Sequence, residues 1–181
     1  MKYHNITKAD MLNGEGLRVV LWVSGCSHHC PGCHNAVTWD PNDGLEFDEA
    51  AKKEIFDELK HDWCSGITLS GGDPLYLGNR KVISELVCEI RSKFKDKSIW
   101  LYTGYTWDVL LKQAKTDKDL DAILKHIDVL LDGKFVMRLA SVKIEYVGSS
   151  NQEIIDVKKS LKSGKKVLYI DNSKILEGEE V

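Results

Sequence analysis

The sequence predicts an α/β fold in which helices cover a mostly parallel sheet. Short apolar runs end repeatedly in glycine-containing turns, and the segments between several of these runs have helical periodicity. The 181 residues contain no repeat or linker that would divide them. In parallel sheets the loops that follow the strands gather at one face. We therefore expect a single domain over residues 1–181, with its glycine turns meeting at one edge.

Five apolar runs are the candidate strands. Each is short, rich in aliphatic or β-branched residues, and closed by a turn, as buried strands are. They are VVLWV before SGC, ITL before SGGDP, IWLY before TGY, DVLL before DGK, and IEYV before GSSNQ. The segment KKVLYID predicts a last strand, and the polar residues 172–181 after it predict a flexible tail.

Three segments have the spacing of amphipathic helices. Val82, Leu86 and Ile90 recur every four residues and predict a helix of about fifteen residues. The segments DEAAKKEIFDELKH and QEIIDVKKSLKSG predict two more. Helices of this length suit the crossovers between parallel strands.

Composition argues against nucleic acid and membranes as partners. A formal charge of −3 gives no basic field for either nucleic acid or anionic lipid. The longest apolar run, residues 19–23, is too short to cross a bilayer, and the first residues lack the apolar core of a signal peptide. We expect a soluble cytoplasmic protein.

Three of the five cysteines lie close together, in the loop after the first predicted strand. Cys26, Cys30 and Cys33 follow the pattern C-x3-C-x2-C. In a reducing compartment such a group is more often a metal site than a disulfide framework. Structural zinc sites and typical iron–sulfur clusters use four protein ligands, so three cysteines leave one coordination position open for a substrate.

A zinc site is the alternative that the spacing leaves open. His28, His29 or His34 could complete a Cys3His set, which would make the chain a structural or interaction module. The other two cysteines, Cys64 and Cys88, lie beside predicted strand and helix segments, where small buried thiols are ordinary. We expect neither to be a ligand.

Seven motifs together carry a family resemblance. They are NGEGLR, CPGCHN, TW at residues 38–39, SGGDPL, TGY, DGKF and GSSNQ. With this set, residues 1–155 resemble the radical S-adenosylmethionine superfamily and, within it, the family that activates anaerobic ribonucleoside-triphosphate reductase. The resemblance implies that the α/β fold is a partial (incomplete) β/α barrel of the radical S-adenosylmethionine type.

The resemblance also implies the chemistry. The three cysteines would hold a 4Fe-4S cluster whose fourth iron binds S-adenosylmethionine. Reductive cleavage of this cofactor would give methionine and a 5′-deoxyadenosyl radical, which takes a hydrogen atom from a glycine of the partner reductase. A low-potential donor such as flavodoxin or ferredoxin would supply the electron. The alternative partner is another glycyl-radical enzyme, such as a formate-lyase type, because its activators share CHN and TWD.

The resemblance assigns cofactor contacts but no catalytic side chain beyond the cluster ligands. The methionine end of S-adenosylmethionine would lie against Gly71, Gly72 and Asp73, where a backbone without Cβ allows close approach. The adenosine side would lie along Gly32, Cys33 and His34. The pair Asp132 and Lys134 resembles an Asp-x-Lys found near the cofactor in related activases.

Two positions depart from the family pattern. Many members of the superfamily have an aromatic residue where this chain has Gly32, and relatives often have an arginine where it has Val147. The contact with adenine and the task of that arginine must therefore be met differently here.

Overall fold

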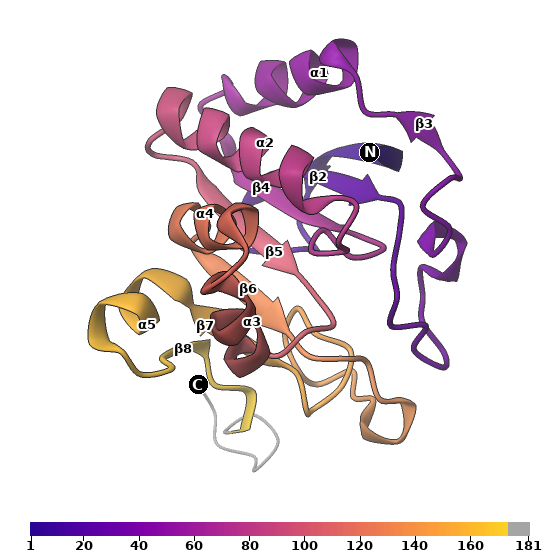
Figure 1. The fold of residues 1–181 in the computed structure, drawn as a ribbon, viewed down its shortest axis with the longest axis vertical. Helices are drawn as coiled ribbons and strands as arrows, with labels where there is room; N and C mark the ends of the chain where they lie inside the picture. The colour runs from indigo at the N-terminus through magenta and orange to yellow at the C-terminus, as the bar shows by residue number, and fades with distance from the viewer. Residues whose placement is uncertain (174–181) are drawn as a thin grey trace.

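The chain forms one eight-stranded sheet with helices packed against it (Figure 1). The structure, a computed structural model, describes residues 1–173, so most of the tail predicted at 172–181 lies outside the described residues. The strands are β1 (Lys2–Asp10), β2 (Leu17–Val23), β3 (Leu45–Glu46), β4 (Cys64–Gly71), β5 (Ser98–Tyr102), β6 (Val129–Asp132), β7 (Glu153–Asp156) and β8 (Leu168–Ile170). The helices are α1 (Glu49–Leu59), α2 (Arg80–Lys93), α3 (Trp107–Ala114), α4 (Lys118–His126) and α5 (Val157–Ser163), with short 3-10 helices η1 (Ala36–Thr38) and η2 (Met137–Leu139).

The centre of the sheet is parallel and its flanks are antiparallel. The strand order is β3-β1-β2-β4-β5-β6-β7-β8. Strands β2, β4, β5 and β6 pair in parallel, whereas β1 and β7 run antiparallel to their neighbours. Within residues 1–173 the edge strands β3 and β8 do not pair with each other, so the sheet is open, as in a partial barrel. The predicted α/β class is confirmed.

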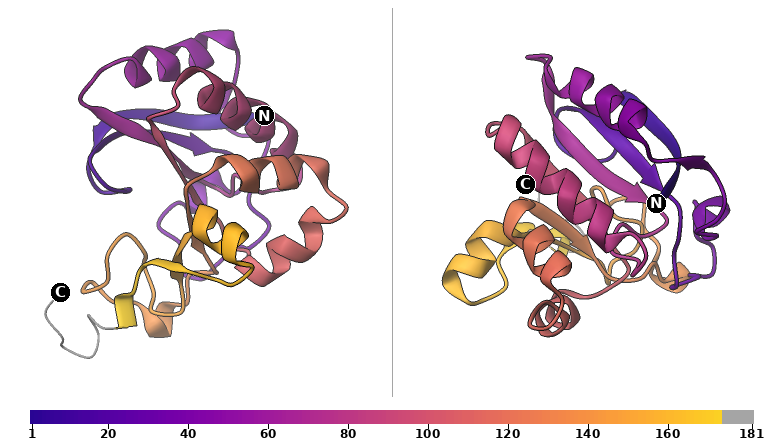
Figure 2. Two further views of the ribbon diagram at one scale, coloured as in Figure 1. Left: turned by 90° about the vertical axis from the view of Figure 1, so that its left-hand side faces the viewer. Right: turned by 45° about the horizontal axis from the view of Figure 1, so that its top comes forward.

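The parallel strands are buried on both faces, and the two faces differ in chemistry. Aliphatic side chains such as Leu21, Leu69 and Leu101 share one core with the apolar faces of α1, α2 and α4, the helices that cover this side of the sheet in Figure 2. On the other face, Trp100 belongs to a second core with Val147, which lies beyond β6. We call the core that the helices cover the outer core, and the second one, which contains Trp100, the inner core.

The expected helix over QEIIDVKKSLKSG is wrong in its first half. Residues Glu153–Asp156 form β7, and α5 begins only after them. Ile154 packs in the inner core and Ile155 in the outer one, as neighbouring residues of a buried strand do. Asp156 then ends the strand and caps α5, because its side chain accepts a hydrogen bond from the Lys159 N–H at 2.9 Å.

The expected strand over IEYV is also wrong. Ile144 and Val147 are buried in the inner core, but the segment between them bends. Tyr146 has a φ of +55°, which an extended strand does not allow. Its carbonyl accepts a hydrogen bond from the Tyr102 hydroxyl at 2.7 Å, so the bend is fixed from β5.

Other predicted elements are confirmed, but several elements went unpredicted. Helices α1 and α2 and strand β8 form where their patterns indicated. The sequence analysis missed β1, in which Ile6 is the buried apolar residue, and the helices α3 and α4. Within residues 1–173, no helix combines the length and apolar character that crossing a membrane requires.

A buried arginine joins three of the four parallel strands, β2, β4 and β5, near their amino ends. Arg18 of β2 is fully buried. Its guanidinium donates to the Thr68 hydroxyl (2.8 Å) and to the carbonyl of Ile67 (2.8 Å), both in β4. It also donates to the hydroxyl (2.9 Å) and carbonyl (3.0 Å) of Ser98 in β5. Its carbon Cζ lies 5.2 Å from the centre of the Trp100 ring, within cation–π range.

We expect Arg18→Met to lower the free energy of unfolding by roughly 3 kcal/mol or more, because the buried carbonyl of Ile67 and the half-buried carbonyl of Ser98 each lose a donor. Urea unfolding followed by circular dichroism measures this. The exposed Arg138 gives the matched control, Arg138→Met. Equal stability of the two variants would contradict a structural role for the Arg18 network.

Candidate cofactor site

The three clustered cysteines line one cavity. Cys26, Cys30 and Cys33 are free, half-buried thiols, and all three border a cavity of about 150 Å³. Cys64 and Cys88 do not line it: Cys64 is buried at the start of β4, and the sulfur of Cys88 in α2 lies 3.7 Å from His126. The structure therefore separates the three clustered cysteines from Cys64 and Cys88, and the ligand role of the cluster stays a prediction.

The predicted convergence of the glycine turns is confirmed. Residues that follow β2, β4, β5 and β6, together with Gln152 of the GSSNQ segment, surround the cysteine cavity. They include Gly71, Gly72, Thr103, Gly104, Gly133, Lys134 and Phe135. This is the edge where the carboxyl ends of the parallel strands meet.

Backbone hydrogen bonds hold the start of the cysteine loop from two sides. On one side, the N–H groups of Gly25 and Cys26 donate to the carbonyls of Thr38 (2.8 Å) and Trp39 (3.0 Å). On the other, the Asp73 N–H donates to the Gly25 carbonyl at 2.8 Å. The TW and SGGDP motifs therefore fix the position of the first cysteine.

Gly72 is needed for this packing. A Cβ at Gly72 would lie 2.5 Å from the carbonyl oxygen of Gly25 and 2.8 Å from that of Thr38. The family resemblance implies that the missing Cβ allows the close approach of a ligand. The structure gives a different reason, the close approach of the cysteine loop itself.

Asp73 connects three turns through a buried carboxylate. One oxygen, Oδ2, accepts hydrogen bonds from His28 Nε2 (2.8 Å), the Thr103 hydroxyl (3.0 Å) and the Gly104 N–H (3.1 Å). The other accepts from the Leu75 N–H at 2.8 Å. The residue is 1% exposed and does not line the cavity. Its carboxylate therefore has partners within the protein, and a direct contact with the cofactor stays a prediction.

A second, larger cavity adjoins the first. It has a volume of about 470 Å³ and shares Cys33, Ser70, Tyr102, Phe135 and Gln152 with the cysteine cavity. Its remaining lining residues include His34, Trp22, Tyr146 and Val147. Two of the three residues predicted for the adenosine side, Cys33 and His34, therefore face this space.

Gly32 does not line either cavity. Its φ is +76°, and a Cβ there would lie 2.2 Å from the Met137 methyl carbon. Met137 occupies the direction in which an aromatic side chain at this position would extend. Aromatic surface in the larger cavity comes from Trp22, Tyr102 and Phe135 instead.

Asp132 and Lys134 lie in different surroundings, and only Lys134 borders the cysteine cavity. Lys134 is exposed and borders the cysteine cavity. Asp132 is buried, and its carboxylate accepts from the Trp107 N–H at 2.7 Å, at the first residue of α3. Burial raises the pKa of Asp132 above its ordinary value. The contacts of Asp132 are those of a helix cap.

The GSSNQ segment supports the DGKF turn through side-chain hydrogen bonds. This contact could not be predicted from the sequence. Gln152 Oε1 accepts from the N–H groups of Gly148 (3.0 Å) and Ser149 (3.1 Å), while its Nε2 donates to the Gly133 carbonyl (2.9 Å). Asn151 Nδ2 donates to the Lys134 carbonyl at 2.8 Å. The side-chain amides of Asn151 and Gln152 thus hold the backbone of residues 133–134, next to Phe135, which lines both cavities.

The geometry disfavours a closed zinc site. Within residues 1–173, no three His, Cys, Asp or Glu side chains form a group that could hold a single metal ion. A zinc ion needs its thiolates about 2.3 Å from one centre, whereas each cysteine of an iron–sulfur cluster binds a different iron. His28 also directs Nε2 to Asp73. The three cysteines around one cavity fit a cluster better than a single ion.

Comparison with known proteins gives the family. The 4Fe-4S single cluster domain family matches residues 12–155. Anaerobic ribonucleoside-triphosphate reductase-activating proteins align over 85% of this chain: that of Enterobacteria phage T4 is 42% identical, with 93% of its length covered. Those of Escherichia coli K12 and Vibrio cholerae are 42% and 40% identical, each with 97% covered. The chain belongs to this family of activating proteins.

For a member of this activating-protein family, the radical S-adenosylmethionine fold and the 4Fe-4S cluster follow. Five of the family motifs surround the cysteine cavity. CPGCHN, SGGDPL, TGY, DGKF and GSSNQ each contribute lining residues to the cysteine cavity. Val147, which stands where relatives often have arginine, is 8% exposed and packs in the inner core.

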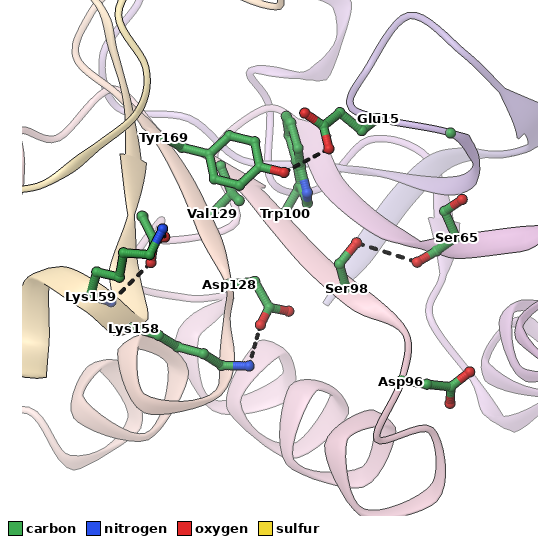
Figure 3. Close-up of a pocket in the computed structure, with 12 residues that line it drawn as sticks. Glu15, Ser65, Asp96, Ser98, Trp100, Asp128, Val129, Lys158, Lys159 and Tyr169 are labelled. Carbon is green, nitrogen blue, oxygen red and sulfur yellow. Dashed lines mark hydrogen bonds and ion pairs between the residues drawn. The ribbon is translucent and has the colours of Figure 1, made fainter.

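Another cavity, of about 550 Å³, lies at the amino ends of β4, β5 and β6, where Ser65, Ser98 and Val129 line it. Figure 3 shows residues that surround this cavity. Its charged groups are largely paired with one another: Lys158 with Asp128, and Lys159 with Asp156 at 3.0 Å. Tyr169 donates to Glu15 at 2.6 Å. None of the cysteines that surround the cofactor site lines this cavity. Of the family motifs only NGEGLR contributes to it, through Glu15 and Gly16.

We expect Gly72→Ala to lower the iron content of anaerobically reconstituted protein, because its Cβ pushes the Gly25 carbonyl and with it the cysteine loop. Iron and sulfide assays measure this. The matched control is Gly78→Ala, whose Cβ would meet the movable Tyr76 ring at 3.1 Å. A Gly72→Ala protein with full iron and weakened S-adenosylmethionine binding would restore the explanation by ligand approach.

Proposed function

We propose that this chain activates an anaerobic ribonucleoside-triphosphate reductase by forming a glycyl radical on it, through reductive cleavage of S-adenosylmethionine at a 4Fe-4S cluster. One observation supports this most: Cys26, Cys30 and Cys33 surround a small cavity that continues into a larger one. A cluster with one open iron and a bound cofactor need two adjoining spaces of this kind.

In this proposal the cluster and S-adenosylmethionine, when bound, supply one-electron cleavage of a carbon–sulfur bond and removal of a hydrogen atom from a glycine Cα. The cysteines hold the cluster, and the three-ligand set leaves one iron for the cofactor. Gly71, Gly72 and Lys134 border the cysteine cavity and would receive the polar methionine end.

The larger cavity would receive the adenosine. Adenine is a flat aromatic ring, and Trp22, Tyr102 and Phe135 provide rings in the cavity wall. His34 lies 6.0 Å from Phe135 between ring centres and adds a fourth. Together with the backbone around Cys33, these residues would take over the adenine contact that Gly32 lacks.

A protein substrate fits the surroundings of this cavity. Leu12, which lines the larger cavity, is 81% exposed, and Met137, which covers Gly32, is 61% exposed. Val37 is 66% exposed and lines a neighbouring hollow that shares Trp22 and Asn35 with the larger cavity. Exposed apolar groups of this kind are typical of protein-docking surfaces. The reductase would dock here and present its glycine, while a flavodoxin or ferredoxin would supply the electron.

We expect Cys26→Ala, Cys30→Ala and Cys33→Ala each to abolish a stable cluster, because each removes a ligand to one iron. Wild-type protein should bind about four irons per chain after anaerobic reconstitution. Cys64→Ala and Cys88→Ala are the controls and should keep the iron. Stoichiometric zinc without iron in the wild type would favour the zinc module over the radical enzyme.

We expect wild-type protein, mixed anaerobically with the reductase, S-adenosylmethionine and a reductant, to give a glycyl doublet in the electron-spin spectrum, with 5′-deoxyadenosine and methionine. The variant Leu12→Asp should keep its iron and lose most of the doublet, because a charge is placed on the docking surface. A doublet on a formate-lyase-type enzyme and none on the reductase would assign the alternative partner.

A further inference from the structure

Two loops that line the larger cavity contact the end of the chain around β8. Leu12 and Asn13 line this cavity from the loop before β2, and residues 146–148 line it from the loop before β7. We call these two loops, residues 12–16 and 144–148, the rim loops. The cavity keeps its shape only where both rim loops are held in place.

Tyr169 of β8 holds the first rim loop. Its hydroxyl donates to the Glu15 carboxylate at 2.6 Å, and Figure 3 shows this bond beside the Trp100 ring. The rings of Tyr169 and Trp100 meet edge to face, with 5.4 Å between their centres. The loop itself lies against Trp100, because a Cβ at Gly14 would be 2.9 Å from that ring. A hydrogen bond to a charged group thus joins β8 to a loop already seated on the inner core.

Asn172 holds the second rim loop. Its side-chain amide pairs with both backbone groups of Glu145: Oδ1 accepts from the N–H at 3.1 Å, and Nδ2 donates to the carbonyl at 3.2 Å. The next residue, Tyr146, has a φ of +55°, a conformation that persists only where the surroundings impose it. The Tyr146 ring also meets Trp100 edge to face, with 5.3 Å between the centres. Asn172 therefore helps to hold a strained turn in the cavity wall.

Both contacts come from outside the cofactor cavities and outside the family core. Tyr169 and Asn172 line neither the larger cavity nor the cysteine cavity. They also lie beyond residue 155, where the match to the family model ends. Trp100, which lies between the two rim loops, is 1% exposed, so the ring that both loops contact is itself fixed. The two residues thus affect the cavity through the rim loops.

We propose that Tyr169 and Asn172 are positioning residues that hold the two rim loops and thereby raise the affinity of the larger cavity for S-adenosylmethionine. This rests on the proposed function, since it takes the larger cavity as the adenosine site. A loop that already has its bound conformation loses less conformational entropy when the cofactor binds. The cysteine loop and the cluster that it would hold are left unchanged.

Two single variants and the corresponding double variant test the two contacts separately. Tyr169→Phe keeps the ring against Trp100 and removes the bond to Glu15. Asn172→Ala removes the amide pair with Glu145. Amide hydrogen exchange of the rim loops is measured on iron-free protein. Iron content and affinity for S-adenosylmethionine are measured on anaerobically reconstituted protein.

Each single variant has a matched control. Tyr3→Phe also removes a phenol hydroxyl, but Tyr3 packs against the outer core and lines neither cofactor cavity. Ser173→Ala removes a polar group next to Asn172, and the Ser173 hydroxyl donates within its own turn, to Asp171 at 2.5 Å. Both controls should match the wild type in exchange, iron content and affinity.

We expect Tyr169→Phe to speed exchange in residues 12–16, and Asn172→Ala in residues 144–148, each by about fivefold. The double variant should keep its iron and bind S-adenosylmethionine about tenfold more weakly. Unchanged exchange in both rim loops, or unchanged affinity despite faster exchange, overturns the proposal. Loss of iron in the double variant overturns it too, because the effect must be confined to the rim loops. Failure of the wild type to bind iron or S-adenosylmethionine would overturn the proposed function instead.

Discussion

The buried carboxylate of Asp73 is the constraint on which the cofactor site depends. A carboxylate that is 1% exposed costs several kcal/mol unless donors surround it. Its donors come from the turns that follow β2, β4 and β5, in the form of His28, Leu75, Thr103 and Gly104. Three turns from separate parts of the chain are thereby fixed around one point, and the cysteine loop is one of them.

The burial of the parallel strands on both faces explains what the sequence could and could not predict of the fold. A run such as VVLWV is buried on both faces, so its strand character is evident but the face of each residue is not. The structure places Leu21 with the helices, whereas Trp22 lines the larger cavity. Residues 153–156 contain one apolar pair, Ile154 and Ile155, which is compatible with either a helix or a strand. Pairing with β6 makes this segment a strand.

The same distinction holds for the cofactor site: its local sequence features could be predicted, whereas its long-range contacts could not. The group of three cysteines follows from local spacing, and the meeting of the glycine turns follows from parallel topology. The partners of Asp73 and Asp132 could not be read from the sequence, because each accepts hydrogen bonds from a turn or helix far along the chain. Gly72 was recognised as necessary, but the atoms that exclude its Cβ belong to Gly25 and Thr38, which only the folded structure brings near.

Arg18 and Asp73 together have a mechanical consequence. Arg18 ties β2, β4 and β5 at their amino ends, and Asp73 ties the turns at their carboxyl ends. Sliding one of these strands past its neighbours would break buried hydrogen bonds near both of its ends, so the parallel centre of the sheet resists shear.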